Sequence, residues 1–214
     1  MIFNKDMLLL YAVSDQNPSK KRTLYDMIED SLKGGVTLVQ LREKSLAENE
    51  FIEEAIMIKE LCHRYNVPLI INDNVDVALK SGADGVHVGA DDEPVAEIRS
   101  RVGRDFIIGA TAKTVEQAQK AEKAGADYLG VGAVFPSPTK KNAIRITIEK
   151  LREICASVFI PAVAIGGIGL DNVMELKGGG MSGIAVVSAI FSAHDIESAA
   201  AELKKKAQAV TKIC

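Results

Sequence analysis

The segment KSGADGVHVG, residues 80–89, contains the pattern that decides the fold. A glycine follows a stretch of helical periodicity, and a short apolar, β-branched run follows the glycine. Glycine readily takes the left-handed backbone conformation that ends a helix, so the chain can turn straight back into a strand. The pattern returns in KAGADYLGVG (123–132) and, without the Ala-Asp pair, in GGGMSGIAVV (178–187). The sequence therefore predicts repeated helix-to-strand units.

The same alternation extends along the whole chain. Apolar runs typical of buried strands lie at 8–13, 37–41, 68–72, 85–88, 106–109, 128–132, 161–165 and 183–187. Helical patterns lie at 23–32, 47–65, 74–81, 94–101, 114–124, 147–156, 171–177 and 195–210. Regular alternation implies a parallel sheet with right-handed crossovers, and eight such units in 214 residues close most economically into a barrel. We therefore expect one domain, residues 1–214, with the (βα)8 or TIM-barrel fold.

An open, doubly wound α/β sheet is the alternative fold. It would have fewer strands and a phosphate-binding fingerprint after the first of them. No G-x-G-x-x-G follows Val13, and the G-x-x-x-x-G-K-[ST] loop is absent from the sequence. The barrel is therefore the better interpretation.

Composition and charge narrow the class of protein. Hydrophobic residues make up 47% and charged residues 26%, which is typical of a soluble globular chain. A net charge of −3 gives no overall attraction to nucleic acid or to an acidic membrane surface. The three scattered cysteines fit a reducing compartment, and the apolar run at 7–13 is too short to span a bilayer. We expect a cytoplasmic protein without nucleic-acid or membrane partners, and the sequence is compatible with a homo-oligomer.

Reactive groups of a parallel barrel lie at the carboxyl ends of its strands. The second strand reads TLVQLREK, residues 37–44, and alternate residues share a face, so Gln40, Arg42 and Lys44 project together. Arg and Lys at the end of this face suit an anion such as phosphate. An ordinary charged loop is the alternative.

Acidic residues follow the next two strands. Asn72 and Asp73 end the third strand, and Asp92 follows the fourth. Carboxylates opposite a basic strand end suit Mg²⁺, which combines one or two carboxylates with water and substrate phosphate oxygens. Asp73 could instead cap the helix beginning at Asn74. His87 alternates with apolar neighbours, so we expect it to point into the barrel as a hydrogen-bonded structural residue.

The remaining strand ends offer a second anion site. Gly166 and Gly167 after the seventh strand let backbone N–H groups approach a ligand, and a short helix predicted at Ser188 adds its positive end. A tight turn is the alternative. Hydroxyl and ammonium groups also follow the fifth and sixth strands: Thr111, Lys113, Ser137, Thr139 and Lys140. Two separate anion sites indicate two phosphorylated substrates, one of them a diphosphate whose departure a metal assists.

Taken together, these segments resemble the thiamine phosphate synthase (thiamine-phosphate pyrophosphorylase) family. The resemblance rests on TLVQLREK, INDNVDVAL, ADGVHVGADD, GATAKT, DYLGVGAVFPSPTKKNA, AIGGI and VVSAI, in the family's order. It implies transfer of the 4-amino-2-methylpyrimidinylmethyl group from its diphosphate to the nitrogen of thiazole ethyl phosphate, with Mg²⁺. Diphosphate and thiamine phosphate are the products. Ala90, Thr111 and Ser137 depart from the commonest family pattern, and the two hydroxyl residues keep the donor.

The resemblance also assigns roles residue by residue. The pyrimidine diphosphate would be bound by Gln40, Arg42, Lys44, Asn72, Thr111 and Lys140, of which Arg42, Lys44 and Lys140 would act in catalysis by stabilising the leaving group. The thiazole phosphate would be bound by Ser137, Thr139, Gly167, Val187 and Ser188. Asp73 and Asp92 would hold the Mg²⁺.

Three alternative functions stay open at the level of sequence. A related thiazole tautomerase would use a histidine where Lys113 stands and would not need Asp73, Asp92 and Lys140. A sugar-phosphate isomerase would leave the second anion site unexplained. A non-catalytic phosphate-binding barrel is the third, and the anion-binding groups at every strand end count against it.

Overall fold

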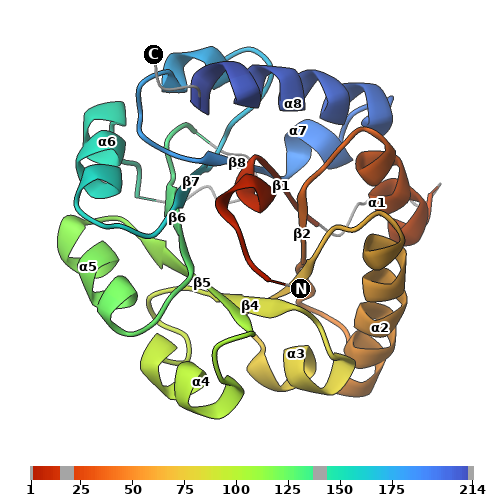
Figure 1. Ribbon diagram of the computed structural model, residues 1–214. Helices are drawn as coiled ribbons and strands as arrows, with labels where there is room; N and C mark the ends of the chain where they lie inside the picture. Colours follow the sequence, from red (N-terminus) through yellow and green to blue (C-terminus); the bar gives the residue numbers. More distant parts are fainter. Residues whose placement is uncertain (1, 15–21, 137–143, 212–214) are drawn as a thin grey trace.

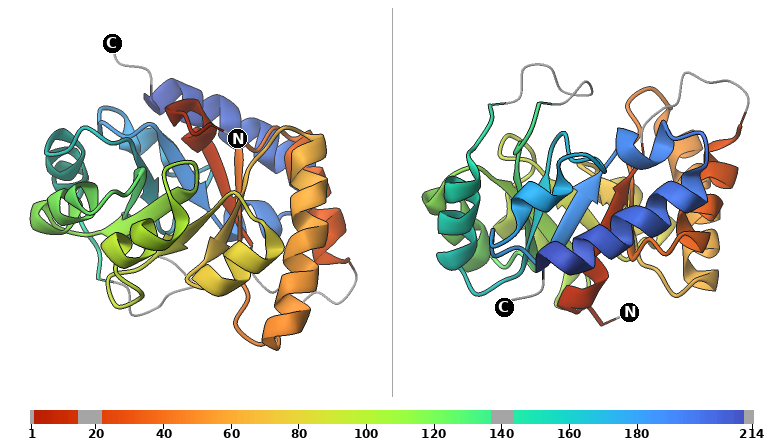
Figure 2. Two further views of the ribbon diagram at one scale, coloured as in Figure 1. Left: turned by 60° about the horizontal axis from the view of Figure 1, so that its bottom comes forward. Right: turned by 90° about the horizontal axis from the view of Figure 1, so that it is seen from above.

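Eight parallel strands form a closed barrel in the computed structural model, which describes residues 2–14, 22–136 and 144–211 (Figure 1). Each strand pairs with the next, and the last strand pairs with the first, Tyr11 facing Ala185. Helices surround the strands on the outside (Figures 1 and 2). The predicted (βα)8 barrel is therefore confirmed, and the doubly wound sheet is wrong.

The element bounds follow the predicted ranges closely. The strands are β1 (Leu10–Val13), β2 (Leu38–Leu41), β3 (Leu69–Asn72), β4 (Gly85–Val88), β5 (Ile107–Ala112), β6 (Tyr128–Gly132), β7 (Ala162–Ile165) and β8 (Gly183–Val186). The helices are α1 (Leu24–Lys33), α2 (Glu48–Arg64), α3 (Val75–Ser81), α4 (Val95–Val102), α5 (Val115–Lys123), α6 (Ile148–Ala156), α7 (Ser188–Phe191) and α8 (Ile196–Thr211). Two 3-10 turns, η1 (Lys5–Leu8) and η2 (Val173–Leu176), complete the order.

Three elements differ from the sequence predictions. β5 continues to Ala112 because its last residues pair with β6, Thr111 with Gly130 and Ala112 with Val131. The helix predicted at 171–177 is only the 3-10 turn η2, which runs into a glycine-rich segment. η1 was not predicted. It precedes β1 and lies over the amino end of the barrel, the end that faces the reader in Figure 1.

The core has two layers, separated by the barrel wall. Alternate strand residues point inward, among them Tyr11, Leu38 and Tyr128. The residues between them, such as Val39 and Leu41, pack outward against the helices in the larger apolar cluster. This alternation is the two-residue period of a strand, so the face predicted to hold Leu38 and Gln40 does point into the barrel.

The repeated Ala-Asp pair has a structural role that the sequence pattern did not reveal. Asp84 accepts the N–H of Leu69 at the start of β3 (2.8 Å), and Asp127 accepts the N–H of Ile108 near the start of β5 (2.7 Å). Each carboxylate therefore ties the turn after a helix to the amino end of a neighbouring strand. Arg99 holds Asp127 in turn, at 2.6 Å.

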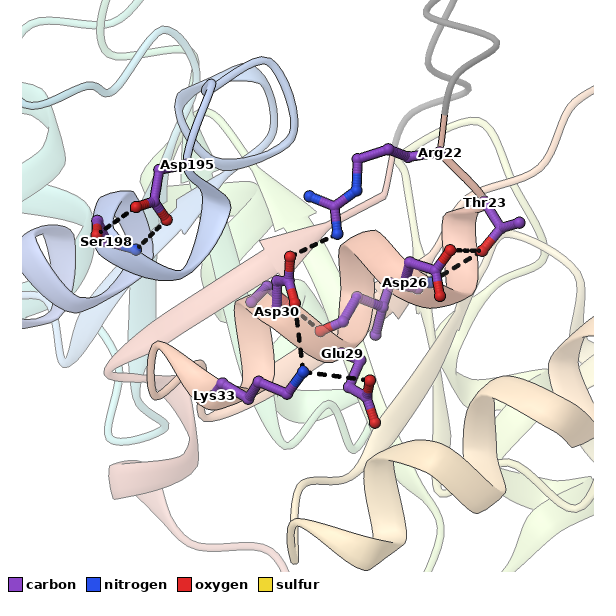
Figure 3. Close-up of polar contacts among 10 residues, drawn as sticks. Arg22, Thr23, Asp26, Glu29, Asp30, Lys33, Asp195 and Ser198 are labelled. Carbon is purple, nitrogen blue, oxygen red and sulfur yellow. Dashed lines mark hydrogen bonds and ion pairs between the residues drawn. The ribbon is translucent and has the colours of Figure 1, made fainter.

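Side-chain caps fix the amino-terminal ends of α1 and α8, the outer helices next to β1. Thr23 accepts the N–H of Asp26 (3.1 Å) and so begins α1, and Asp195 accepts the N–H of Ser198 (2.9 Å) at the start of α8 (Figure 3). A Thr or Asp cap of this kind satisfies a backbone donor that the helix itself leaves unpaired. Asp30 also bridges Arg22 and Lys33 in the same view.

Candidate active site

A cleft of about 600 Å³ opens at the carboxyl ends of β2 and β3. Lys44, Asn72 and Asp73 line it, three of the residues that the sequence singled out. The other lining residues are Glu43, Leu46, Glu48, Phe51, Asn74, Val75, Asp76 and Glu93. The structure therefore brings one predicted cation, one amide and one carboxylate into a shared cavity.

The basic end of β2 is held by a residue that sequence reasoning missed. Ser14, fully buried after β1, accepts the backbone N–H of Arg42 through its hydroxyl (2.8 Å). Its own backbone N–H donates to the carbonyl of Gln40 (2.8 Å). The signal in the sequence that could have identified Ser14 is its place directly after an all-apolar strand. Ser14 thus fixes the backbone on both sides of Leu41, where two predicted substrate contacts lie.

Asp73 is held in the cleft by both its backbone and its carboxylate. Its φ angle is +61°, in the left-handed region that side chains other than glycine seldom adopt, although Asp and Asn tolerate it best. Its backbone N–H donates to the carbonyl of His87 (2.9 Å). Its carboxylate accepts from Lys44 Nζ and from Asn72 Nδ2, each at 2.7 Å. The surrounding structure therefore holds this carboxylate toward the cleft.

The helix-capping interpretation of Asp73 is wrong. α3 begins at Val75, and the cap is Asn74, whose Oδ1 accepts the N–H of Val77 (2.9 Å). Because the neighbouring amide performs this function, Asp73 has no capping role. Strained backbone of this kind is concentrated at functional sites, where the rest of the structure enforces it.

Asp92 lies in the loop after β4, and β4 is the strand next to β3. Its Oδ2 accepts the N–H of Gly89 (2.7 Å), which folds the loop back toward the strand end. In the part of the chain that the structure describes, no three acidic, histidine or cysteine side chains gather closely enough to hold a metal ion. Asp92 is not among the residues that line the cleft around Asp73.

His87 points into the barrel, as predicted, and is hydrogen-bonded on both ring nitrogens. Nδ1 lies 3.1 Å from the Tyr128 hydroxyl, and Nε2 lies 3.1 Å from Thr111 Oγ1. Tyr128 also contacts Tyr11 (2.8 Å), which accepts a hydrogen bond from Gln40 Nε2 (2.5 Å). Two predicted substrate contacts, Gln40 and Thr111, are therefore joined through the barrel interior.

The glycines after β7 serve the close packing of the chain itself. Gly166 and Gly167 have φ angles of +104° and +65°. A Cβ on Gly167 would lie 2.2 Å from the Pro136 carbonyl oxygen, so the loop after β6 can approach only a glycine. Asn172 holds the turn by donating to the Gly167 carbonyl (2.9 Å), a role that sequence reasoning missed.

The neighbouring strand β8 leads to Val187 and then to α7, a single helical turn that begins at Ser188, as predicted. Gly167 and Val187 therefore follow adjacent strands. The predicted residues Ser137, Thr139 and Lys140 lie outside the described residues, so the structure does not place them relative to this second group.

Fold and site together define a class: a (βα)8 barrel with charged and polar groups gathered at the carboxyl ends of its strands, where enzymes of this fold carry out their chemistry. The family model described as thiamine monophosphate synthase matches residues 10–190. The chain belongs to this family.

Curated relatives agree over almost the whole chain. The thiamine-phosphate synthase of Ruminiclostridium cellulolyticum is 50% identical over 194 residues, which cover 91% of this chain and 92% of the relative. The thiamine-phosphate synthase of Methanobrevibacter smithii is 46% identical over 202 residues, covering 94% and 96%.

A solved structure shows the same architecture. The thiamine phosphate pyrophosphorylase from Pyrococcus furiosus superposes with a TM-score of 0.89 at 38% identity, covering 97% of this chain and 99% of that one. The structure titled "Native KDPGal structure" superposes with a TM-score of 0.73 at 17% identity, and this likeness shows the fold alone.

Proposed function

We propose that the protein is a thiamine phosphate synthase that joins the pyrimidine diphosphate to thiazole ethyl phosphate. The main support is the 46–50% sequence identity with thiamine-phosphate synthases over more than 90% of the chain. The hydrogen-bonded group of Lys44, Asn72 and Asp73 at the barrel mouth is the supporting structural feature. The reaction breaks the C–O bond between the pyrimidine methylene and the diphosphate, which leaves with the electron pair. The thiazole nitrogen then forms the new C–N bond, and the nitrogen becomes a cation.

The protein's part in this reaction is electrostatic stabilisation and positioning. Arg42, Lys44 and Lys140 stabilise the negative charge that develops on the leaving diphosphate. Preorganised groups of this kind typically contribute about 10²–10³-fold each to the rate. Gln40, Asn72 and Thr111 orient the pyrimidine diphosphate through hydrogen bonds. Holding both reactants in line supplies the remaining advantage, because it makes the bond-forming step effectively intramolecular.

The second substrate binds on the other side of the mouth, after β6, β7 and β8. Its phosphate contacts Ser137, Thr139, Gly167, Val187 and Ser188 in this proposal. The turn after β7 supports it, because Asn172 fixes the Gly167 backbone beside the strand that leads to Ser188.

Mg²⁺ is the cofactor that we propose, and Asp73 and Asp92 would hold it. When bound, the ion would neutralise diphosphate charge and so assist its departure. Asp73 fits this role because the fold presents its carboxylate at the cleft, where Lys44 now pairs with it. When substrate binds, Lys44 is available to pair with a diphosphate oxygen instead.

We predict that Asp92→Asn raises the Mg²⁺ concentration needed for half-maximal activity by at least about tenfold. Asparagine can still accept the Gly89 N–H, so the loop keeps its hydrogen bond while the charge is lost. A Mg²⁺ titration of the initial rate measures the effect. Asp91→Asn, which removes the neighbouring exposed carboxylate, is the matched control and should titrate like the wild type. An unaltered Mg²⁺ requirement in Asp92→Asn would refute the assignment.

Growth complementation tests the function in cells. A bacterial strain that lacks its own thiamine-phosphate synthase should grow without added thiamine when it expresses this chain. The Asp73→Asn variant, expressed at the same level, should restore growth poorly. If the wild-type protein is soluble and abundant and growth still requires added thiamine, the proposed function is wrong.

The setting of this activity is also proposed. We infer that residues 1–214 form one domain in the cytoplasm and act on small molecules without nucleic-acid or membrane partners. Among the helices within the described ranges, none is long and apolar enough to cross a membrane. The barrel is compatible with a homo-oligomer.

A further inference from the structure

A chain of hydrogen bonds crosses the barrel interior. Its two end residues are proposed substrate contacts, and the three residues between them have no role in the reaction described above. It runs from Gln40 on β2 through Tyr11, Tyr128 and His87 to Thr111 on β5, with distances of 2.5, 2.8, 3.1 and 3.1 Å. Tyr11 and Tyr128 are almost fully buried, at 1% and 0% exposure, and His87 is 7% exposed. A polar chain so deep in an apolar interior is costly unless every member is satisfied.

The direction of the protons along this chain follows from the chemistry of its first member. Nε2 of Gln40 can only donate, so the Tyr11 oxygen accepts there, and the Tyr11 proton goes to its other partner, Tyr128. The Tyr128 proton is then directed to His87 Nδ1. The opposite direction would leave the buried Tyr11 proton without an acceptor among the described residues. Burial raises the pKa of both phenols, so both keep their protons at neutral pH.

The histidine tautomer and the Thr111 hydroxyl follow from that direction. Because Nδ1 accepts from Tyr128, the ring proton of His87 lies on Nε2 and is donated to Thr111 Oγ1. The Thr111 oxygen then acts as an acceptor inside the barrel, and its own proton is available to a ligand at the mouth. At the other end, the bond from Nε2 turns the Gln40 carbonyl oxygen away from Tyr11.

We propose that Tyr11, Tyr128 and His87 are positioning residues that set the hydrogen-bonding polarity of the pyrimidine diphosphate site, making Thr111 a donor and Gln40 Oε1 an acceptor. An aminopyrimidine diphosphate fits this polarity, because its exocyclic amino group donates and its diphosphate oxygens and ring nitrogens accept. This inference rests on the proposed function and adds three residues that do not touch the substrate.

The first test needs no substrate. Long-range ¹H–¹⁵N correlation NMR distinguishes the two neutral histidine tautomers, and the chain has three histidines. Single glutamine variants of His63 and His194 identify the other two signals. We expect His87 in the Nε2–H form. An Nδ1–H form would overturn the proposal whether or not the protein is a synthase.

Matched phenylalanine variants separate the two ends of the chain. Tyr128→Phe removes the donor to His87, so the pure Nε2–H signature should be lost and kcat should fall about three- to tenfold. Tyr11→Phe removes a hydroxyl of equal burial and leaves Tyr128 able to donate. The His87 signature should persist, while KM for the pyrimidine diphosphate rises through Gln40. Loss of the Nε2–H signature in Tyr11→Phe alone would contradict the proposed direction.

A double-mutant cycle shows whether Tyr128 acts through Thr111. Thr111→Val removes the hydroxyl and keeps the side-chain shape. If Tyr128 only positions Thr111, adding Tyr128→Phe to Thr111→Val should leave kcat unchanged. Additive losses would mean a general structural effect and would overturn the proposal. Absence of synthase activity in the wild type, with the His87 tautomer as expected, would instead count against the proposed function alone.

Discussion

Replacing Asp73 with asparagine is expected to lower kcat by about 10²–10³-fold, the usual cost of removing one preorganised electrostatic group from an active site. The carboxylate lies 2.7 Å from Lys44 Nζ in the cleft, and in our proposal it would hold the Mg²⁺ that assists departure of the diphosphate. Asparagine is chosen because it removes only the charge. It tolerates the left-handed backbone conformation at φ +61°, whereas alanine would be strained there. Steady-state rates at saturating substrates and Mg²⁺ measure the effect.

Asp76→Asn is the control for this variant. Asp76 lines the same cleft, but its side chain is 60% exposed and pairs with Arg101 outside the strand ends. Exposed pairs of this kind contribute little, so we expect a rate near that of the wild type. Equal activity in Asp73→Asn and Asp76→Asn, with both variants folded, would remove Asp73 from the reaction.

Gly183→Ala is expected to have the largest effect on stability. Gly183 begins β8, and a Cβ there would lie 1.8 Å from the carbonyl oxygen of Leu8 and 2.4 Å from its carbon. Both atoms are backbone, so relief requires moving η1 away from the seam where β8 pairs with β1 and closes the barrel. We expect a loss of more than about 4 kcal/mol in the free energy of unfolding, a large part of a domain's usual stability.

Chemical denaturation of the purified protein measures this loss of stability. In cells, we expect the same variant to give a lower yield of soluble protein. Gly169→Ala is the matched control, because a Cβ there meets no atom within 4 Å. Its unfolding free energy should stay within about 0.5 kcal/mol of the wild type. Near-native stability of Gly183→Ala would show that the barrel seam adapts more readily than its geometry indicates.

The sequence was sufficient for the fold because the signals that define it are local. A glycine that ends a helix and the β-branched run that follows lie within ten residues of each other, as in 80–89, and the same signal recurs along the chain. The parallel barrel then places every strand end at one mouth. The face shared by Leu38 and Gln40 was predictable for the same reason, since it depends only on the two-residue period of a strand.

The site was predictable only in part. From spacing alone, Asp73 could be either a helix cap or a metal ligand. Which residue caps the helix depends on which of three consecutive polar residues accepts the N–H of Val77. The contact between Tyr11 and Tyr128 joins residues 117 positions apart and depends on how the closed barrel staggers its strands. Ser14 likewise acts across a strand pair, on the backbone of Arg42. Such contacts leave no periodic pattern in the sequence.

The most direct test of the central claim is to follow both products of the coupling in one sample by ³¹P NMR. Wild-type protein is mixed with pyrimidine diphosphate, thiazole ethyl phosphate and Mg²⁺, and samples that lack one component serve as controls. We predict that inorganic diphosphate and thiamine phosphate appear in equal amounts, and only in the complete mixture. Unchanged substrate signals in that mixture, with folded protein and both ligands shown to bind, would contradict the account.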